Sequence, residues 1–120
     1  MDATKTVAAL SALAHEHRLA IYRMLVECGP NGLPAGVIAE QLAVPPSSLT
    51  FHLQHLLRAG LVTQRRMSRQ LIYAADFTAM NDLVGYLTEN CCQGNPAACG
   101  LPVGQPQSAC QPASATKRKA

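Results

Sequence analysis

The chain has 120 residues, a length that suits one domain with its own hydrophobic core but leaves it small enough to gain from dimerisation. Ten Lys and Arg residues against seven Asp and Glu residues give a net charge of +3, which permits a nucleic-acid partner without requiring one. No apolar run reaches the length of a membrane span and the N-terminus lacks a secretory pattern, so we expect a cytoplasmic protein with no membrane partner.

Two helices are predicted before the first clear break, one over residues 4–14 and one from residue 16 or 17 to Cys28. The apolar face of the first helix needs a partner, and it consists of Val7, Leu10, Leu13 and Ala14. The core stripe expected in the second helix is Leu19, Tyr22, Leu25 and Val26. Arg18 and Arg23 are expected to point outward, and Cys28 to be a small core or subsurface residue.

The next two helices are predicted to form a helix-turn-helix. After a break at 29–32, Pro34 can open a third helix that ends near Leu42. Pro46 suits the first position of a fourth helix, and Gly60 suits the position just past its end. The buried stripe of this fourth helix is expected to be Leu49, Leu53, Leu56 and Leu57. Two short helices joined by a tight turn, the second with a polar face, predict a helix-turn-helix.

A hairpin and a last helix are predicted to follow. The hydrophobic period changes towards two after Leu61, which predicts strands over 61–65 and 70–74 around a tip at 66–69. Asp76 can cap a last helix that has no later element to pack on. The apolar seam of that helix is Phe77, Met80, Leu83, Val84 and Leu87. We therefore expect the first and last helices to form the interface of a homodimer.

Glycine and proline interrupt any regular pattern after Asn90. Residues 91–120 are therefore predicted to be a flexible tail rich in Cys, Pro and Gly. Residues 1–90 are predicted to form one domain of the α+β class, mostly α, with about five helices and a two-stranded β-hairpin. This arrangement is a winged helix-turn-helix.

The fourth helix and the hairpin carry candidate DNA-contacting residues. Affinity for DNA needs cations over phosphates, and specificity needs polar or methyl-contacting groups over base edges. Gln54 can pair with adenine, Phe51 can touch a thymine methyl, and for His52 packing or phosphate contact is expected rather than metal ligation. The predicted DNA-contacting residues are Ser47, Ser48, Thr50, Phe51, His52, Gln54, Arg58, Arg65, Arg66 and Arg69. The alternative is a merely solvated helix face and hairpin tip.

The run His-Leu-x-x-Leu-x-x-Ala-Gly-Leu-Val over 52–62 resembles the recognition helix and first wing strand of the ArsR/SmtB family of winged-helix, metal-responsive repressors. Residues 12–21, Ala-Leu-Ala-His-Glu-His-Arg-Leu-Ala-Ile, are similar to the start of the family's second helix, and 61–73 resemble its wing. The resemblance covers about residues 6–90. It implies a non-enzymatic, homodimeric repressor on double-stranded operator DNA, with its interface in the first and last helices.

Four of the five cysteines lie in the last 30 residues, which argues against a disulfide framework and indicates a soft-metal or redox site. Cys91 and Cys92 are adjacent, and Cys99 follows on a loop that can fold back. Three sulfurs suit trivalent arsenic or antimony, whereas zinc prefers four ligands, usually with Cys-x-x-Cys spacing. Cys110 can in principle be a fourth ligand, although a spare thiol is the expectation. The bland alternative is a disordered tail that simply contains cysteines.

The family resemblance sharpens this hypothesis. Many arsenic-responsive members hold a Cys-Val-Cys run before the recognition helix, and the matching segment 33–38 has no cysteine. Zinc-sensing members place Asp and His along the last helix, and 76–90 contains no histidine. A Cys-Cys pair with a third Cys downstream is similar to arsenic-responsive variants with a C-terminal site. The predicted inducer is arsenite, As(III), or else antimonite, Sb(III), or a methylated arsenical, bound by Cys91, Cys92 and Cys99, which implies a role in arsenic resistance.

Three alternatives stay open. The same cysteines can sense oxidants, with Cys91 or Cys92 forming a disulfide to Cys99. A small thiol enzyme would need a His or a cation beside its thiol, yet all four histidines lie in the first half of the chain. A winged helix that serves only protein contacts would bind DNA weakly and without salt dependence.

Overall fold

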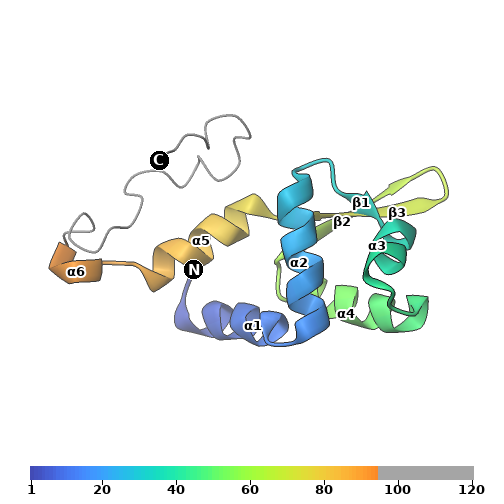
Figure 1. The fold of residues 1–120 in the computed structure, drawn as a ribbon. Helices are drawn as coiled ribbons and strands as arrows, with labels where there is room; N and C mark the ends of the chain where they lie inside the picture. The colour runs from blue at the N-terminus through green and yellow to red at the C-terminus, as the bar shows by residue number, and fades with distance from the viewer. Residues whose placement is uncertain (95–120) are drawn as a thin grey trace.

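The computed structural model describes residues 1–94 (Figure 1). Its elements are, in order, α1 (Ala3–Leu13), α2 (Glu16–Cys28), β1 (Leu33–Pro34), α3 (Ala35–Leu42), α4 (Pro46–Arg58), β2 (Val62–Met67), β3 (Gln70–Ala75), α5 (Phe77–Leu87) and α6 (Cys91–Gly94). The predicted winged helix-turn-helix, mostly helical, is confirmed. Among these helices of residues 1–94, none has the length and apolarity that a bilayer crossing requires.

Local signals in the sequence set the helix boundaries. Pro46 occupies the first turn of α4, after Pro45 in an extended conformation with ψ 143°. Gly60 follows the helix with a φ of +78°, a left-handed conformation that glycine adopts without strain. The carboxylate of Asp76 accepts a hydrogen bond of 3.0 Å from the N–H of Ala79, which caps α5 as predicted.

The sheet has one strand more than expected. The strand order is β1-β3-β2, with both pairings antiparallel. The hairpin pairs Val62 with Ala75 at its base and Met67 with Gln70 at its tip, so both strands extend beyond the predicted ranges. β1 pairs Leu33 with Tyr73. The prediction of a two-stranded hairpin was therefore incomplete, because a strand of two residues is too short to show any periodicity.

The core lies where α2, α3, α4 and the start of the hairpin meet. Its largest fully buried side chains are Ile21, Leu25, Ile38, Leu49, Leu53, Leu56 and Leu61. The predicted stripe of α4 is confirmed for Leu49, Leu53 and Leu56, which are at most 2% exposed, while Leu57 is half-buried against the core. In α2, however, the prediction for Leu19 was wrong: Leu19 is 46% exposed and Ile21 takes its place in the core. The buried stripe of α2 is thus Ile21, Tyr22 and Leu25.

The hydroxyl of Tyr22 is buried and has no hydrogen-bond partner within residues 1–94. Burial, and secondly the negative charge of Asp76, raise the pKa of Tyr22 to about 12. The phenol therefore stays neutral at physiological pH and packs as part of the core.

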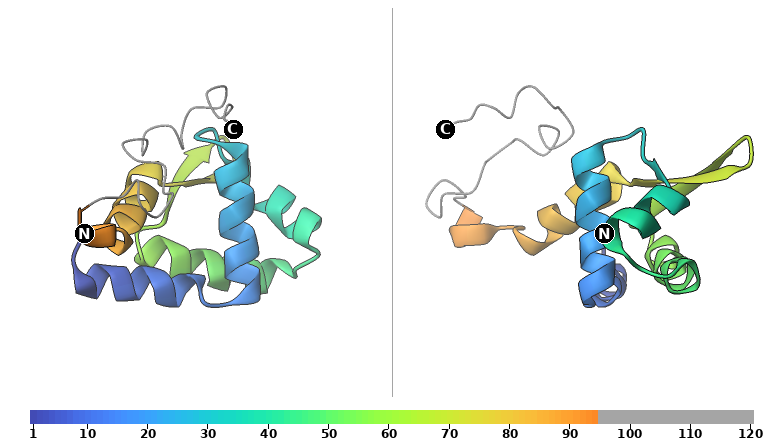
Figure 2. Two further views of the ribbon diagram at one scale, coloured as in Figure 1. Left: turned by 60° about the vertical axis from the view of Figure 1, so that its left-hand side comes forward. Right: turned by 45° about the vertical axis from the view of Figure 1, so that its right-hand side comes forward.

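The helices α1 and α5 expose apolar side chains. In α1 the small residues Ala9 and Ala12 and the hydroxyl-bearing Thr6 face the core. Four large apolar side chains of α1 and α5 remain exposed, with exposed fractions of 42–62%, and they are Val7, Leu10, Val84 and Leu87. Of the seam predicted for α5, only Leu83 is buried within the single chain. Figure 2 shows α5 leaving the body on the side opposite to the wing. The two helices thus share an apolar surface that no other part of residues 1–94 covers.

Candidate DNA-binding surface and inducer site

One side of α4 presents all but His52 of the residues on this helix that the sequence assigns to DNA contact. Its residues are Ser47, Ser48, Thr50, Phe51, Gln54 and Arg58, all exposed except Gln54, which is half-buried. Phe51 is 57% exposed, and its ring lies edge-on to His55 at a centroid distance of 4.7 Å. The Thr50 hydroxyl donates to the carbonyl of Pro46 (3.0 Å), while the residue as a whole stays exposed. DNA contact by these residues stays a prediction.

The hairpin and α4 belong to a purely cationic stretch of chain. Between Glu40 and Asp76 there is no Asp, Glu or Lys, and the four arginines give this stretch a formal charge of +4 with His neutral. These arginines are Arg58, Arg65, Arg66 and Arg69, and all four are exposed. Within residues 1–94 the structure has a single ion pair, between Arg23 and Glu27 on α2, so none of the four is neutralised there. A polyanion is therefore attracted to this surface.

The three wing arginines differ in what they contact. Arg65 donates from Nη2 to the carbonyl of Asn31 at 2.9 Å and lies 3.7 Å from the Met67 sulfur. Neither Arg66 nor Arg69 has a hydrogen bond or ion pair of its side chain in the part of the chain that the structure describes. Arg65 thus helps to fasten the wing to the loop before α3, while the other two are available for phosphates.

Arg18 and His52 join α1, α2 and α4. The prediction that Arg18 points outward was wrong: its Nε donates to the carbonyl of Ala12 at 2.6 Å, and its Nη1 lies 3.5 Å from Nδ1 of His52. His52 is only 7% exposed, so it packs towards α2 and does not share the exposed side with Phe51. Of the two roles expected for His52, packing fits this burial better than phosphate contact.

The structure brings together three histidines that the sequence analysis did not group. Ring centroids lie 4.6 Å apart for His15 and His52, and 5.4 Å apart for His17 and each of the other two. His15 also caps α2, since its Nδ1 accepts a hydrogen bond of 3.0 Å from the N–H of His17. The signal was the His-x-His spacing at the start of α2, but nothing in the sequence placed His52 beside it.

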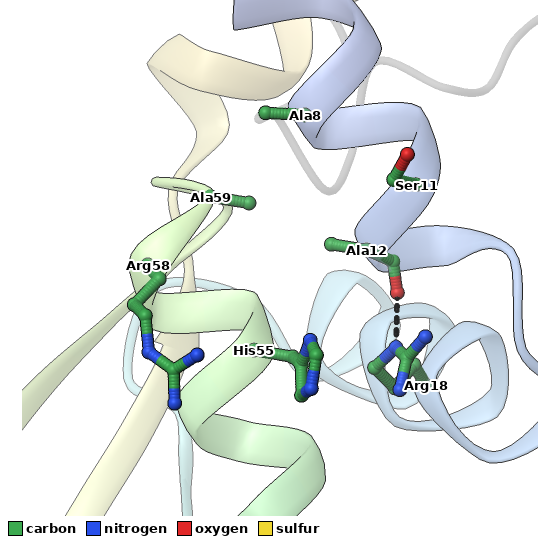
Figure 3. A pocket seen from close by; sticks show the side chains of 7 residues that line it. All are labelled: Ala8, Ser11, Ala12, Arg18, His55, Arg58 and Ala59. Carbon is green, nitrogen blue, oxygen red and sulfur yellow. Dashed lines mark hydrogen bonds between the residues drawn. The ribbon is translucent and has the colours of Figure 1, made fainter.

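Burial and neighbouring charges lower the pKa values of two histidines on α4. Burial, and then the neighbouring His15 and Arg18, hold the pKa of His52 below its ordinary value. The pKa of His55 is also lowered, first by desolvation and then by Arg18 and Arg58. Figure 3 shows His55 between these two arginines in a groove of about 450 Å³ between α1 and α4. His52 and His55 are therefore expected to be neutral at neutral pH.

Two of the three predicted inducer ligands lie just beyond α5. Cys91 is half-buried and Cys92 is exposed, in the single turn α6. This turn is left-handed rather than α-helical, with φ values of 53° at Cys92 and 58° at Gln93. Cys99 and Cys110 lie outside the described residues, and so does the predicted tail from residue 95 onward. The three-thiol site and the two-part division of the chain stay predictions.

The placement expected for Cys28 was wrong, because Cys28 is exposed at the end of α2. Its thiol donates to the carbonyl of Gly32 at 3.3 Å, across the loop that leads into β1. This cysteine belongs to the end of the domain where α2 meets the sheet, and its thiol serves as a turn contact.

Comparisons with known proteins point to one class. The family described as "Helix-turn-helix domain" matches residues 13–65. The transcriptional activator HlyU of Vibrio cholerae serotype O1 is 33% identical over 94 residues, which cover 78% of this chain and 84% of HlyU. The structure of HlyU from Vibrio cholerae N16961 matches with a TM-score of 0.59 and 35% identity, over 72% of this chain and 97% of that chain. HlyU has also been solved in a reduced form.

Two further structures share the fold at lower identity. An ArsR-like transcriptional regulator from Rhodococcus sp. RHA1 matches with a TM-score of 0.66 and 23% identity, over 80% of this chain and 88% of that chain. The homodimeric winged helix-turn-helix DNA-binding domain of Mb0332 from Mycobacterium bovis, a possible ArsR-family regulator, matches with a TM-score of 0.58 and 23% identity. That match covers 72% of this chain and 81% of the domain.

An exposed polar helix in a helix-turn-helix, placed beside a cationic hairpin, defines a winged-helix DNA-binding regulator of transcription. The relatives are regulators of transcription and not enzymes. The chain belongs to the ArsR/SmtB family of winged-helix transcriptional regulators.

The cationic wing gives a first testable expectation. We expect Arg66→Ala to weaken DNA binding at all sequences and to reduce the slope of log K against log[salt] by about one for each subunit on the DNA. Fluorescence anisotropy of a labelled duplex at several salt concentrations measures this slope. Arg23→Ala is the matched control, because Arg23 pairs with Glu27 on α2. An Arg66→Ala slope equal to that of the native protein would show that the wing does not reach the phosphates.

Proposed function

We propose that the protein is a homodimeric repressor that leaves its operator when trivalent arsenic or antimony binds Cys91, Cys92 and Cys99. The observation that carries the proposal is the position of two adjacent cysteines at the end of α5, the helix whose exposed apolar seam suits a partner subunit. An inducer bound there acts directly on the element that would hold the dimer together.

The exposed apolar residues support the dimer. Val7 and Leu10 on α1 and Val84 and Leu87 on α5 lie on helices that contact one another, and each is at least 42% exposed. Such a surface is costly in water and is covered when a second copy packs on it by two-fold symmetry. The related fold of Mb0332 is homodimeric. A dimer would place two α4 helices about one DNA turn apart, roughly 34 Å, over an inverted repeat.

The chemistry of the three thiols selects the inducer. Thiolates favour soft ions, and trivalent arsenic forms three bonds to sulfur and keeps a lone pair on its open side. Binding would fix the left-handed turn at Cys92 and Gln93 and the chain to Cys99 against the end of α5. By linkage, the inducer binds less tightly to the DNA complex, and a hundredfold effect on DNA affinity needs only about 2.7 kcal/mol of coupling.

The test is the anisotropy of a labelled operator from upstream of the protein's own gene. We expect micromolar arsenite to release the native protein and Cys28→Ser alike, whereas Cys92→Ser stays bound. Cys28→Ser is the matched control because Cys28 is exposed and lies at the other end of the domain. Release of Cys92→Ser at the same arsenite concentration would overturn the proposed inducer site while leaving the DNA-binding assignment intact.

A second candidate function uses the same cysteines as an oxidant sensor. It is favoured by the relative HlyU, one structure of which is described as the reduced protein. Oxidation by peroxide would join Cys91 or Cys92 to Cys99, with two electrons passing to the peroxide. Mass spectrometry after peroxide treatment without metal separates the two functions. HlyU is named as an activator, so in vitro transcription with and without protein is needed to fix the sign of regulation.

A further inference from the structure

His15, His17 and His52 bring nitrogen atoms from the start of α2 and the middle of α4 within 4.8 Å of one another. We propose that these three imidazoles form a binding site for a divalent transition-metal ion of the zinc class, which would tie α2 to the recognition helix. The site uses neither the thiols nor the DNA-contacting side of α4, so it stands apart from the proposed inducer site.

The distances between the three histidine nitrogens are close to those in a metal site, and side-chain rotation is enough to bring them into range. Nitrogen ligands lie about 2.0–2.1 Å from tetrahedral zinc, so neighbouring ligand nitrogens are roughly 3.4 Å apart. The three atoms must therefore approach by about an ångström and a half from the 4.8 Å limit. His15 and His17 are exposed and can rotate towards His52, which is buried and fixed by its packing.

The donor set selects the ion. Imidazole nitrogen suits Zn²⁺, Co²⁺, Ni²⁺ and Cu²⁺, whereas Mg²⁺ and Ca²⁺ prefer oxygen ligands that this cluster lacks. A histidine ligates only as the neutral base, so binding should weaken as the pH falls. Three protein ligands leave a fourth position, which water can occupy next to the exposed rings.

Metal binding would exchange existing contacts for the new bonds. Nδ1 of His15 accepts a hydrogen bond from the N–H of His17, and Nδ1 of His52 faces the Arg18 guanidinium, which can only donate. Ligation through Nδ1 replaces these contacts directly, and ligation through Nε2 needs a proton on Nδ1 and so breaks them. Metal binding would therefore break the contact between Arg18 and His52 and the hydrogen bond by which His15 caps α2. In their place, the ion would link the start of α2 to α4.

Cobalt(II) tests the site, because its visible absorption reports four- or five-coordinate binding. The full chain is first alkylated at its thiols, which removes the cysteines as ligands. We expect one equivalent of Co²⁺ per subunit to give visible bands without sulfur charge-transfer absorption, and Zn²⁺ to displace it. His17→Gln changes an exposed residue and keeps the fold, and it should weaken Co²⁺ binding at least about tenfold. His55→Gln is the matched control on α4 and should bind Co²⁺ as the native chain does.

Absence of the visible bands in the native chain would overturn the proposal, and so would equal losses in His17→Gln and His55→Gln. A second readout is thermal unfolding: Zn²⁺ should raise the midpoint of the alkylated native chain and of His55→Gln, but not that of His17→Gln. Equal shifts in all three chains would place the ion elsewhere. Because alkylation removes the thiols before the titration, failure of the arsenic proposal leaves this result unaffected.

Discussion

Val84→Glu should leave the protein folded but monomeric, with operator affinity reduced at least about a hundredfold. Val84 is 54% exposed on α5 and belongs to the apolar surface that α5 shares with α1. In a two-fold dimer each substitution occurs twice, so two carboxylates would be buried at the interface without a partner. In a dimer, binding of one subunit to its half-site raises the effective concentration of the other subunit at the second half-site. A monomer lacks this advantage, and its loss explains the reduced operator affinity.

Sedimentation velocity measures the oligomeric state, circular dichroism checks the fold, and anisotropy with an inverted repeat measures DNA affinity. Leu19→Glu is the matched control, because Leu19 is also a large apolar residue, 46% exposed, but lies on α2. We expect Leu19→Glu to remain dimeric. If Val84→Glu sediments as a dimer with native affinity, the subunit interface lies outside α1 and α5.

Gly32→Ala should destabilise the domain by about 3–4 kcal/mol, close to the largest effects seen for single substitutions. Gly32 has a φ of +75°, and a Cβ there would collide with the carbonyl oxygen of Tyr73 and lie 3.0 Å from the Cβ of Ala74. These obstacles belong to β3, whose backbone is held by pairing on both sides. The new methyl group therefore forces the loop away from the sheet.

Gly29→Ala provides the matched comparison for this substitution. Gly29 also has a positive φ, +93°, but a Cβ there meets nothing within 4 Å. With ψ −172° it lies in a backbone region that essentially only glycine adopts, so alanine should cost this backbone strain alone, roughly 1–3 kcal/mol. Urea unfolding followed by circular dichroism gives both values, and equal destabilisation by the two substitutions would show that the loop yields freely at Gly32.

The sequence predicted best what depends on neighbours along the chain. The boundaries of α2 and α4 follow from proline, glycine and capping residues, which act within one turn. Which face of α2 is buried could not be predicted from such local signals. Leu19 and Ile21 are both apolar, and only the packing of α3 and α4 decides which of them is buried. The strand β1 was missed for a related reason, since its two residues become a strand only by pairing with β3.

The candidate sites divide in the same way. The exposed side of α4 was predictable from helical spacing, which places Ser47, Phe51 and Gln54 together. The inward turn of Arg18 and the histidine cluster were not, because both depend on how α2 crosses α4. Residues about 35 positions apart in sequence, such as His17 and His52, come together only through the tertiary fold.

The pairing of β1 with β3 connects the helix-turn-helix to the wing. Leu33 and Pro34 pair with β3, and Arg65 of β2 holds the carbonyl of Asn31, so the chain before α3 is joined to both strands of the hairpin. α5 follows β3 after a single residue, Asp76. We therefore expect a displacement of α5 to move α4 and the wing together. Phosphate contacts and base contacts should then be lost in one step, and release from DNA should be all-or-none.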